Sequence, residues 1–498
     1  MRFITLAAVT AQLAGEQSLS HPPPPASNAH ALLFHSMRSF RSPATVSNRP
    51  LFFESPIRTA ATLYEPADGK IVFGAWVETE SATTVGPVTL GGDSPSDFNK
   101  RLGLNAGVFH MSQSIPLAIS PFDQTQMTAP LNLIEATKTD AILFLTIYPN
   151  QTAQNPYDLI TDKDVQLLAW QLGNITDPSL SGRRVMLRFG PEMNGNWFTY
   201  GQQPSRYVTE FRRLVTAIRA VTKRVSFVWS PNAGNNYPFG GNFLPNAERT
   251  ALDTNKDGTV DNKDDPFSPY WPGADYVDWV GTSLYWKGDP ATGYPTKDNS
   301  RTPADFWEHM VQGSAVEVVN PAYPFYTQYA EQYNKPLVMS EGGAAFALYQ
   351  EGSTARLPAN QGQLAVQQSF WQSYLNAAFF KKFPKAKMFI NFEHQKVYED
   401  PTTGRNGITR DYRITHEPAV AAALKSDLTA LGSSIEWAGP FVAGYDWLTG
   451  TGGGAAVTTK TGGAAAPTGA ASATTSKSGA YQFSAGVIGF AASIALLL

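Results

Sequence analysis

Eight short apolar runs alternate with longer segments of helical periodicity between residues 61 and 447, and this alternation predicts an α/β fold, a (β/α)8 (TIM) barrel with loop insertions. Each run is apolar nearly throughout, as expected of a parallel strand that is covered on both faces. Between the runs, residues 204–223 and 363–383 place apolar side chains three and four positions apart, which is typical of helices. The runs span residues 71–77, 106–111, 141–149, 184–189, 225–232, 277–286, 336–343 and 387–395.

A doubly wound open sheet is the alternative architecture for alternating strands and helices. The nucleotide-binding form of that fold carries a glycine-rich phosphate loop after its first strand, and no such loop follows residues 71–77. The barrel is therefore the fold that we expect.

The composition is that of a large folded chain with little net charge. The 498 residues are 42% apolar, enough for a sizeable core in one large domain or two ordinary ones. A formal charge of -3 and a pI near 6.2 leave no basic stripe, so we expect neither nucleic acid nor an anionic membrane surface as a partner. The absence of cysteine excludes disulfides, thiolate catalysis and thiolate-bound zinc. The 11 Trp and 20 Tyr suit a protein that presents flat rings to an uncharged ligand.

The two ends of the chain carry targeting signals. Residues 1–20 have the layout of a secretory signal, and residues 21–60 are a proline-containing leader that we expect to be disordered. Residues 448–482 are rich in Gly, Ala, Ser and Thr, and the apolar residues 483–498 end the chain without a following charge. Small residues, a polar spacer and an apolar tail together predict a GPI anchor, hence a secreted or extracellular-surface location; a tail-anchored helix and an apolar end without function are the alternatives. The membrane is then a partner only through that anchor.

Two acceptor sequons accompany these signals. They are Asn150-Gln-Thr and Asn174-Ile-Thr, although such triplets also arise by chance. In a secreted chain both would be glycosylated, so we expect a glycoprotein.

Two glutamates stand where the chemistry of a barrel is found, at the C-terminal ends of strands. Glu192 follows the fourth run and Glu341 lies in the seventh, so we expect them to face each other across the barrel mouth, with Trp197, Tyr285 and Trp286 nearby. One protonated and one ionised carboxyl group in an aromatic setting suit the cleavage of a glycosidic bond. For one isolated glutamate a capping role would be favoured, whereas for this pair we favour catalysis.

Other polar and aromatic residues also stand at strand ends. These are Trp76, His110 and Glu393. Each is expected either to line the cleft or to be a satisfied structural residue.

Three segments resemble blocks of glycoside hydrolase family 26. Residues 187–198, "LRFGPEMNGNWF", are similar to the family's acid/base segment, in which an Arg precedes His-Glu-Met-Asn-Gly and then Trp-Phe. Residues 269–286, "PYWPGADYVDWVGTSLYW", resemble its sixth-strand block, and "PLVMSEGGA", residues 336–344, resembles its nucleophile strand. The blocks follow the family's order, and the resemblance covers residues 65 to 430.

The resemblance implies a retaining endo-β-1,4-mannanase, a glycoside hydrolase that needs no cofactor for its chemistry and acts on a mannan-type polysaccharide. Glu192 would be the general acid/base and Glu341 the nucleophile, with Arg188 holding the charge of Glu341 and Tyr285 orienting it by a hydrogen bond. Trp197 would stack on a sugar ring, and we expect a monomer. The expected substrate-binding residues are Arg188, Asn194, Trp197, Tyr285, Trp286 and His110. Core packing is the alternative for the two tryptophans.

Pro191 departs from the family's pattern, which has a histidine before the acid/base glutamate. Proline offers neither a side-chain donor nor a backbone N–H. Loss of a donor to the sugar hydroxyls in the transition state would cost on the order of 100-fold in rate. An active mannanase, an enzyme for another β-glycan such as a β-1,3/1,4-glucan, and a weakly active or inactive glycan-binding wall protein are the three outcomes that the sequence leaves open.

A second motif lies between the fifth and sixth runs, in "DTNKDGTVDNKDD". Asp253, Asn255, Asp257, Asp261 and Asp264 fall at positions 1, 3, 5, 9 and 12 of the EF-hand loop, with glycine at position 6. Position 12 is Asp in place of Glu, and no helical pattern is evident on either side. We expect a structural calcium ion here, and a solvated acidic turn is the alternative.

Overall fold

The computed structural model describes residues 62–116, 125–239, 246–289, 297–314, 319–399 and 407–452. The predicted signal, leader and apolar tail, and nearly all of the predicted linker, lie outside these residues. Within the described ranges no helix combines the length and the apolar character needed to cross a membrane.

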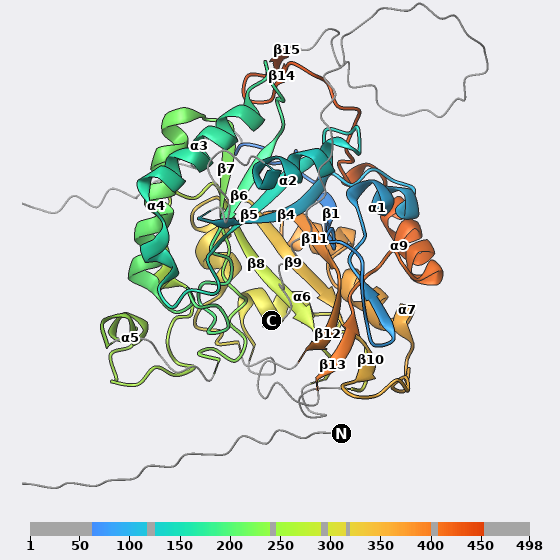
Figure 1. The fold of residues 1–498 in the computed structure, drawn as a ribbon. Helices are drawn as coiled ribbons and strands as arrows, with labels where there is room; N and C mark the ends of the chain where they lie inside the picture. Colours follow the sequence, from blue (N-terminus) through green and yellow to red (C-terminus); the bar gives the residue numbers. More distant parts are fainter. Residues whose placement is uncertain are drawn as a thin grey trace, which may run out of the picture. The chain divides into compact units, whose positions relative to one another are not determined.

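A closed barrel of parallel strands forms the centre of the fold (Figure 1). Its strand order is β1-β11-β9-β8-β7-β6-β5-β4, so the first and last strands of the barrel pair with each other. All eight predicted runs supply one strand each. The strands are β1 (Val72–Val77), β4 (Val108–Ile115), β5 (Ile142–Pro149), β6 (Val185–Phe189), β7 (Val225–Trp229), β8 (Trp279–Trp286), β9 (Leu337–Ala344) and β11 (Ala386–Glu393). The predicted (β/α)8 barrel is confirmed.

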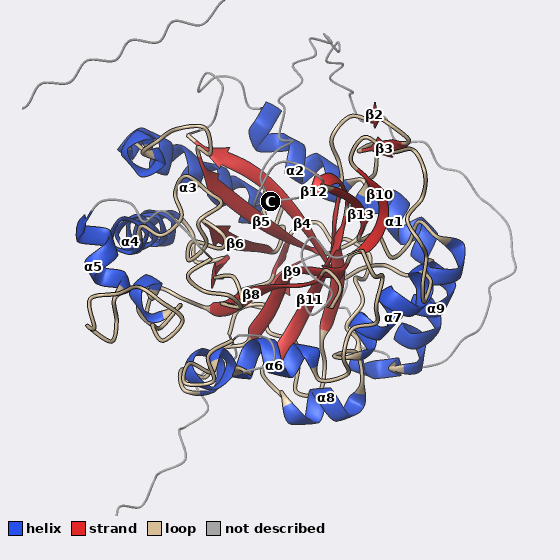
Figure 2. Cartoon of the chain, turned by 90° about the horizontal axis from the view of Figure 1, so that it is seen from below, coloured by secondary structure: helices blue, strands red, loops and turns tan. Residues whose placement is uncertain are grey.

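Helices surround this barrel on its outer side (Figure 2). They cover the outward faces of strands that are buried on both sides, which explains why the strands are apolar nearly throughout. The helices are α1 (Pro95–Leu102), α2 (Thr125–Glu135), α3 (Asp162–Thr176), α4 (Pro204–Val221), α5 (Asn246–Leu252), α6 (Phe306–Gln312), α7 (Gln363–Gln372), α8 (Ala377–Lys382) and α9 (Pro418–Ala430). Short turns of other helix types span Pro156–Leu159, Ser268–Tyr270, Tyr326–Glu331 and Gly432–Ser434.

The predicted helix over residues 363–383 is two helices, α7 and α8. Asn376 interrupts the pattern, because its side-chain oxygen accepts a hydrogen bond from the backbone N–H of Phe379 at 2.8 Å and caps α8. The apolar spacing alone does not distinguish one long helix from two short ones on the same face.

The described residues also form three small antiparallel sheets outside the barrel, which the sequence did not indicate. β10 (Phe346–Gln350), β13 (Ile408–Asp411) and β12 (Gln395–Glu399) pair in that order. β10 begins directly after β9 and β12 directly after β11, so this sheet stands over the C-terminal ends of the barrel strands. The other two sheets pair β2 (Thr83–Val85) with β3 (Val88–Leu90) and β14 (Tyr445–Asp446) with β15 (Thr451–Gly452).

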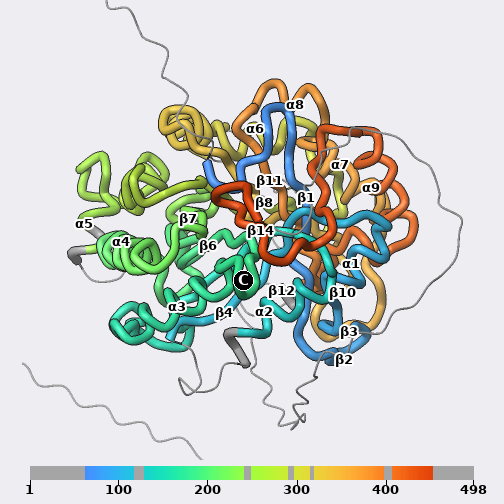
Figure 3. The backbone as a smooth tube through the Cα atoms, turned by 90° about the horizontal axis from the view of Figure 1, so that it is seen from above, coloured from blue at the N-terminus to red at the C-terminus, as the bar shows by residue number. Residues whose placement is uncertain are grey.

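The C-terminal part of the described chain covers the opposite end of the barrel (Figure 3). Asp446 forms a bidentate ion pair with Arg224, just before β7, at 2.6 and 2.9 Å. The Arg184 guanidinium, just before β6, lies 4.2 Å from the ring centre of Trp447. The N-terminal ends of the strands are therefore closed, and the opposite ends carry the candidate site.

Candidate active site

Glu192 is carried by a sharp backbone turn just beyond the end of β6. Gly190 has a φ of 52° and Glu192 one of 53°, both in the left-handed region that residues with a Cβ seldom adopt. The backbone N–H of Glu192 donates to the carbonyl of Ser230, beyond the end of β7, at 3.0 Å. A non-glycine residue held in this region is typical of functional sites.

Glu341, on β9, is buried against a cation and a hydroxyl. Arg188 Nη1 donates to Glu341 Oε2 at 3.0 Å, and Arg188 Nη2 donates to Ser283 Oγ at 2.9 Å. The Ser283 hydroxyl in turn donates to Glu341 Oε1 at 3.2 Å. Arg188 comes from β6 and Ser283 from β8, so three strands fix this carboxylate.

Burial raises the pKa of Glu341 above the ordinary carboxyl value, and the negative charge of Glu192 raises it further. The Arg188 guanidinium and its hydrogen bond, together with the Ser283 hydroxyl, act in the opposite direction. Geometry also links the two glutamates, because Asn232 donates to Glu192 and its backbone bridges to Ser283, a donor to Glu341. The pKa of Glu341 is therefore raised overall, although the neighbouring Arg188 cation favours the ionised form.

Glu192 accepts hydrogen bonds on both carboxylate oxygens. Trp197 Nε1 donates to Oε2 at 2.9 Å, and Asn232 Nδ2 donates to Oε1 at 3.1 Å. Pro191 supplies no donor, and its carbonyl accepts from the Tyr200 hydroxyl at 2.9 Å. Among the described residues no Lys, Arg or His forms an ion pair with Glu192, so its setting differs from that of Glu341.

Tyr285 and Trp286 are successive residues of β8 and point to opposite faces of the strand. Tyr285 points toward the barrel mouth, where burial and the charges of Glu341 and Glu192 raise its pKa well above the usual value and keep it a neutral hydroxyl. The expected hydrogen bond from Tyr285 to Glu341 does not occur among the described residues, where Arg188 and Ser283 are the donors to that carboxylate. Trp286 is 5% exposed, donates to the carbonyl of Ser300 and meets Phe306 edge-on, so it packs in the core instead of lining the cleft.

His110 and Asn194 are also enclosed, each with no exposed surface. His110 Nε2 lies 2.6 Å from Thr146 Oγ1, and burial, with Arg188 and His394, lowers the pKa of His110 well below its usual value. Asn194 uses its whole amide on the backbone of Asn232, donating to the carbonyl at 3.0 Å and accepting from the N–H at 2.8 Å. Both residues thus make hydrogen bonds within the site, and their expected contact with substrate stays a prediction.

Ser283 and Asn232 are site residues that the sequence analysis missed. Ser283 lies two residues before Tyr285 in β8, and Asn232 lies just beyond β7, where it forms an isolated bridge with Ser283. Side chains two residues apart on a strand lie on the same face. Ser283 could therefore have been predicted from its position two residues before Tyr285.

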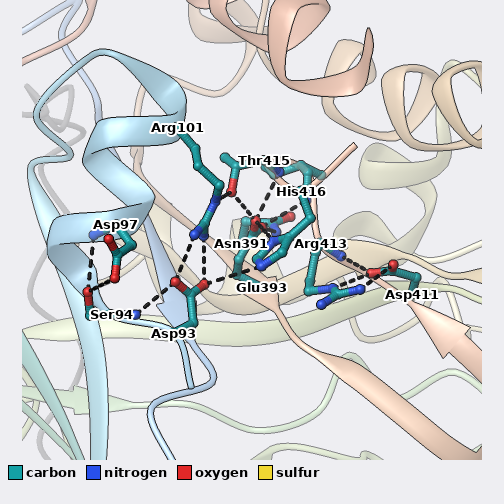
Figure 4. Close-up of polar contacts among 11 residues, drawn as sticks. Asp93, Ser94, Asp97, Arg101, Asn391, Glu393, Asp411, Arg413, Thr415 and His416 are labelled. Carbon is teal, nitrogen blue, oxygen red and sulfur yellow. Dashed lines mark hydrogen bonds and ion pairs between the residues drawn. The ribbon is translucent and has the colours of Figure 1, made fainter. Parts of the chain in front are cut away.

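Glu393 belongs to a separate polar network at the end of β11 (Figure 4). It has no exposed surface, and it accepts from the backbone N–H and the hydroxyl of Thr415. Its Oε1 lies 3.5 Å from His416 Nδ1, and His416 Nε2 lies 3.8 Å from Asp93, which pairs with Arg101 at 2.6 Å. Burial acts to raise the pKa of Glu393, but the donors from His416 and Thr415 lower it. Of the two alternatives for Glu393, its hydrogen bonds favour a satisfied structural residue. It links β11 to α1 through this network.

The predicted calcium loop directly follows α5, a helix that its sequence did not indicate. Both Asp253 oxygens accept backbone N–H groups, those of Asp257 and Gly258. Asp264 is fully buried and accepts from three more, at Thr254, Asn255 and Asp261. Across the described ranges no group of three or more His, Cys, Asp or Glu side chains is placed to hold a metal. Backbone N–H groups of the loop thus already donate to Asp253 and Asp264, and calcium binding at this loop stays a prediction.

Replacing Arg188 by methionine is expected to move the acidic limb of the rate profile to higher pH. Arg188 lowers the pKa of Glu341, the nucleophile that the family resemblance implies, so removal of the cation leaves more of Glu341 protonated at a given pH. The pH dependence of kcat/KM checks this, and Arg301→Met, at an exposed position, is the matched control. An unmoved acidic limb in the active variant would contradict the assigned pairing. We also expect a loss of about 3 to 5 kcal/mol in stability at neutral pH, because a buried pair is broken.

No family model and no curated protein matches the sequence. Solved structures do match. They include Bacillus subtilis mannanase man26 (14% identity, TM-score 0.37, covering 67% of this chain and 82% of that one) and the catalytic domain of Bacillus sp. JAMB-750 GH26 endo-β-1,4-mannanase (15%, 0.42, 74% and 87%). A ruminal GH26 endo-β-1,4-mannanase is a third (11%, 0.37, 74% and 65%).

Proposed function

We propose that this chain is a retaining endo-β-glycosidase that hydrolyses internal β-1,4-mannosidic linkages of mannan or a related β-glycan. The observation that carries the proposal is the unequal setting of two interacting carboxyl groups at the strand ends. Glu341 is paired with the Arg188 guanidinium, whereas Glu192 accepts only neutral N–H donors. The Arg188 cation favours the carboxylate form of Glu341, whereas Glu192 has no cationic partner among the described residues, and this difference assigns the nucleophile to Glu341 and the acid/base role to Glu192.

In the first step an ionised oxygen of Glu341 attacks the anomeric carbon, and the bond from that carbon to the leaving oxygen breaks. Glu192 gives its proton to the leaving oxygen, so that the released sugar is neutral and a glycosyl ester forms on Glu341. In the second step Glu192, now ionised, takes a proton from water, and the water oxygen replaces Glu341 at the anomeric carbon. Two displacements retain the configuration, which requires carboxyl groups roughly 5 to 5.5 Å apart.

A reducing-sugar assay on mannan, xylan and mixed-linkage glucan tests this function. We expect release of internal fragments from mannan, with the first-formed product in the β configuration by NMR. Turnover of another β-glycan alone would keep the glycosidase and change its substrate. Binding of glycan without turnover of any of the three polymers would instead favour a glycan-binding wall protein.

The proposed location is the extracellular surface, through a GPI anchor, with N-glycans at Asn150 and Asn174. This proposal is supported by the sequence of the two chain ends and by the sequons. Asn150 lies beyond the end of β5, and its side-chain oxygen accepts from the backbone N–H of Thr152 at 2.9 Å. Release from cells by a phosphatidylinositol-specific phospholipase, and a lower mass after peptide N-glycosidase, test the two modifications.

We also propose that residues 253–264 bind calcium, on the strength of the spacing of their oxygen side chains. Asp253 accepts one backbone N–H on each carboxylate oxygen, which leaves a lone pair on each oxygen for the ion. Calcium at 100 times its Kd would then stabilise the fold by about 2.7 kcal/mol. Calorimetric titration of EDTA-treated protein and its Tm check this, with Asp253→Asn as the weakened variant. No heat and no shift in Tm with calcium would favour the solvated turn.

A further inference from the structure

Asn232 links the surroundings of Glu192 to those of Glu341. It follows β7, its Nδ2 donates to Glu192 Oε1 at 3.1 Å, and its backbone bridges to Ser283, which donates to Glu341. The side chain is only partly buried, and none of the three segments that resemble the hydrolase family contains it.

The direction of the Asn232 amide is fixed by its neighbours. Its Oδ1 accepts from the backbone N–H of Gly234 at 3.3 Å, and a backbone N–H can only donate. The NH2 group therefore has to face Glu192. Asn194 holds the backbone of the same residue from both sides, at 2.8 and 3.0 Å, so the donor is fixed in position as well as in direction.

We infer that Asn232 is a positioning residue for the acid/base glutamate, which it holds in place and supports in its ionised form. The inference rests on the proposed function, in which Glu192 has to be protonated in the first step and ionised in the second. An N–H donor favours the ionised carboxylate, the form that activates water. Trp197 donates to the other oxygen, and Pro191 cannot donate, so Asn232 is the second donor that this site contains.

The substitutions Asn232→Ala and Asn232→Asp test this position. Both remove the donor, and Asp adds a like charge, so we expect the alkaline limb of kcat/KM on mannan to move to higher pH, further in Asn232→Asp. We expect kcat to fall about tenfold or more, because the acid/base residue is less well positioned. The acidic limb, which depends on Glu341, should stay in Asn232→Ala, which adds no charge. Five other titratable groups act electrostatically on Glu192. They are Tyr148 on β5, Arg188 on β6, Tyr285 on β8, Glu341 on β9 and Tyr200 in the turn after β6.

A second measurement separates this inference from the proposed function. The indole of Trp197 contacts Glu192, so the pH dependence of its fluorescence, isolated by subtracting a Trp197→Phe variant, reports protonation of Glu192 whether or not glycan is cut. We expect its midpoint to move to higher pH in both Asn232 variants and to stay in Asn196→Asp, an exposed control in the loop after β6, where Asn196 Nδ2 donates to the carbonyl of Phe239 and not to Glu192.

The outcomes are distinct. A wild-type protein that cuts no glycan defeats the proposed function, and a shifted fluorescence midpoint would still support the role of Asn232. A uniform loss of rate with unmoved limbs and an unmoved midpoint would make Asn232 merely structural and overturn the inference. Unchanged rates and an unchanged midpoint overturn it as well.

Discussion

Replacement of Glu341 by alanine is expected to lower kcat/KM on mannan by on the order of 10⁵-fold, because the attacking oxygen that forms the glycosyl ester is removed. The matched control is Glu331→Ala, an exposed glutamate whose loss should leave the rate unchanged. Glu341→Gln keeps the size of the side chain beside Arg188 and Ser283, and it should be as inactive as Glu341→Ala while disturbing the fold less.

Azide makes this test specific for the nucleophile. In Glu341→Ala it can enter the space left by the carboxylate and attack an activated aryl mannoside from that face, displacing the phenolate in one step. The product is then the α-azide, with inverted configuration. A β-azide from this variant would assign Glu341 to the other role, and a rate near that of the wild type would remove it from the mechanism.

Replacement of Glu192 by alanine is expected to lower the rate on mannan by about 10²- to 10⁴-fold, the usual contribution of a positioned acid. An aryl glycoside whose leaving group needs no proton should form the glycosyl ester at nearly the normal rate. Hydrolysis of that ester should then be slow, because no base activates water, and added azide should restore turnover and give the β-azide. Equal losses on both substrates, without rescue, would contradict the acid/base assignment.

The barrel could be predicted because each of its strands is covered on both faces. Val72–Val77 and Ile142–Pro149 are apolar nearly throughout for that reason, and such runs are recognisable without any partner. The small sheet of β10, β13 and β12 gave no comparable signal. Its strands carry charged residues, as in Ile408–Asp411, and they form only where two loops from distant parts of the chain meet.

The candidate site was predictable where a residue type is unusual for its place. Carboxylates and an arginine at the ends of apolar strands indicated Glu192, Glu341 and Arg188. Asn232 and Ser283 are ordinary in strands and turns, so only their contacts reveal them. Trp286 was misplaced for a geometric reason, because neighbours on a strand face opposite sides and Tyr285 already occupies the inner one.

The pairing of β1 with β11 has a consequence for how the protein is made. It pairs Val72 with Met388 and Val77 with Glu393, so the barrel cannot close until the last strand, β11, has been synthesised. Contacts of such high sequence separation slow folding and leave strand edges open in the meantime. A growing chain therefore contains Glu192 long before it contains Glu341 and the closing strand. Enzymatic competence should be acquired late in synthesis and in a single step, and fragments that end before Glu393 should be unfolded and inactive.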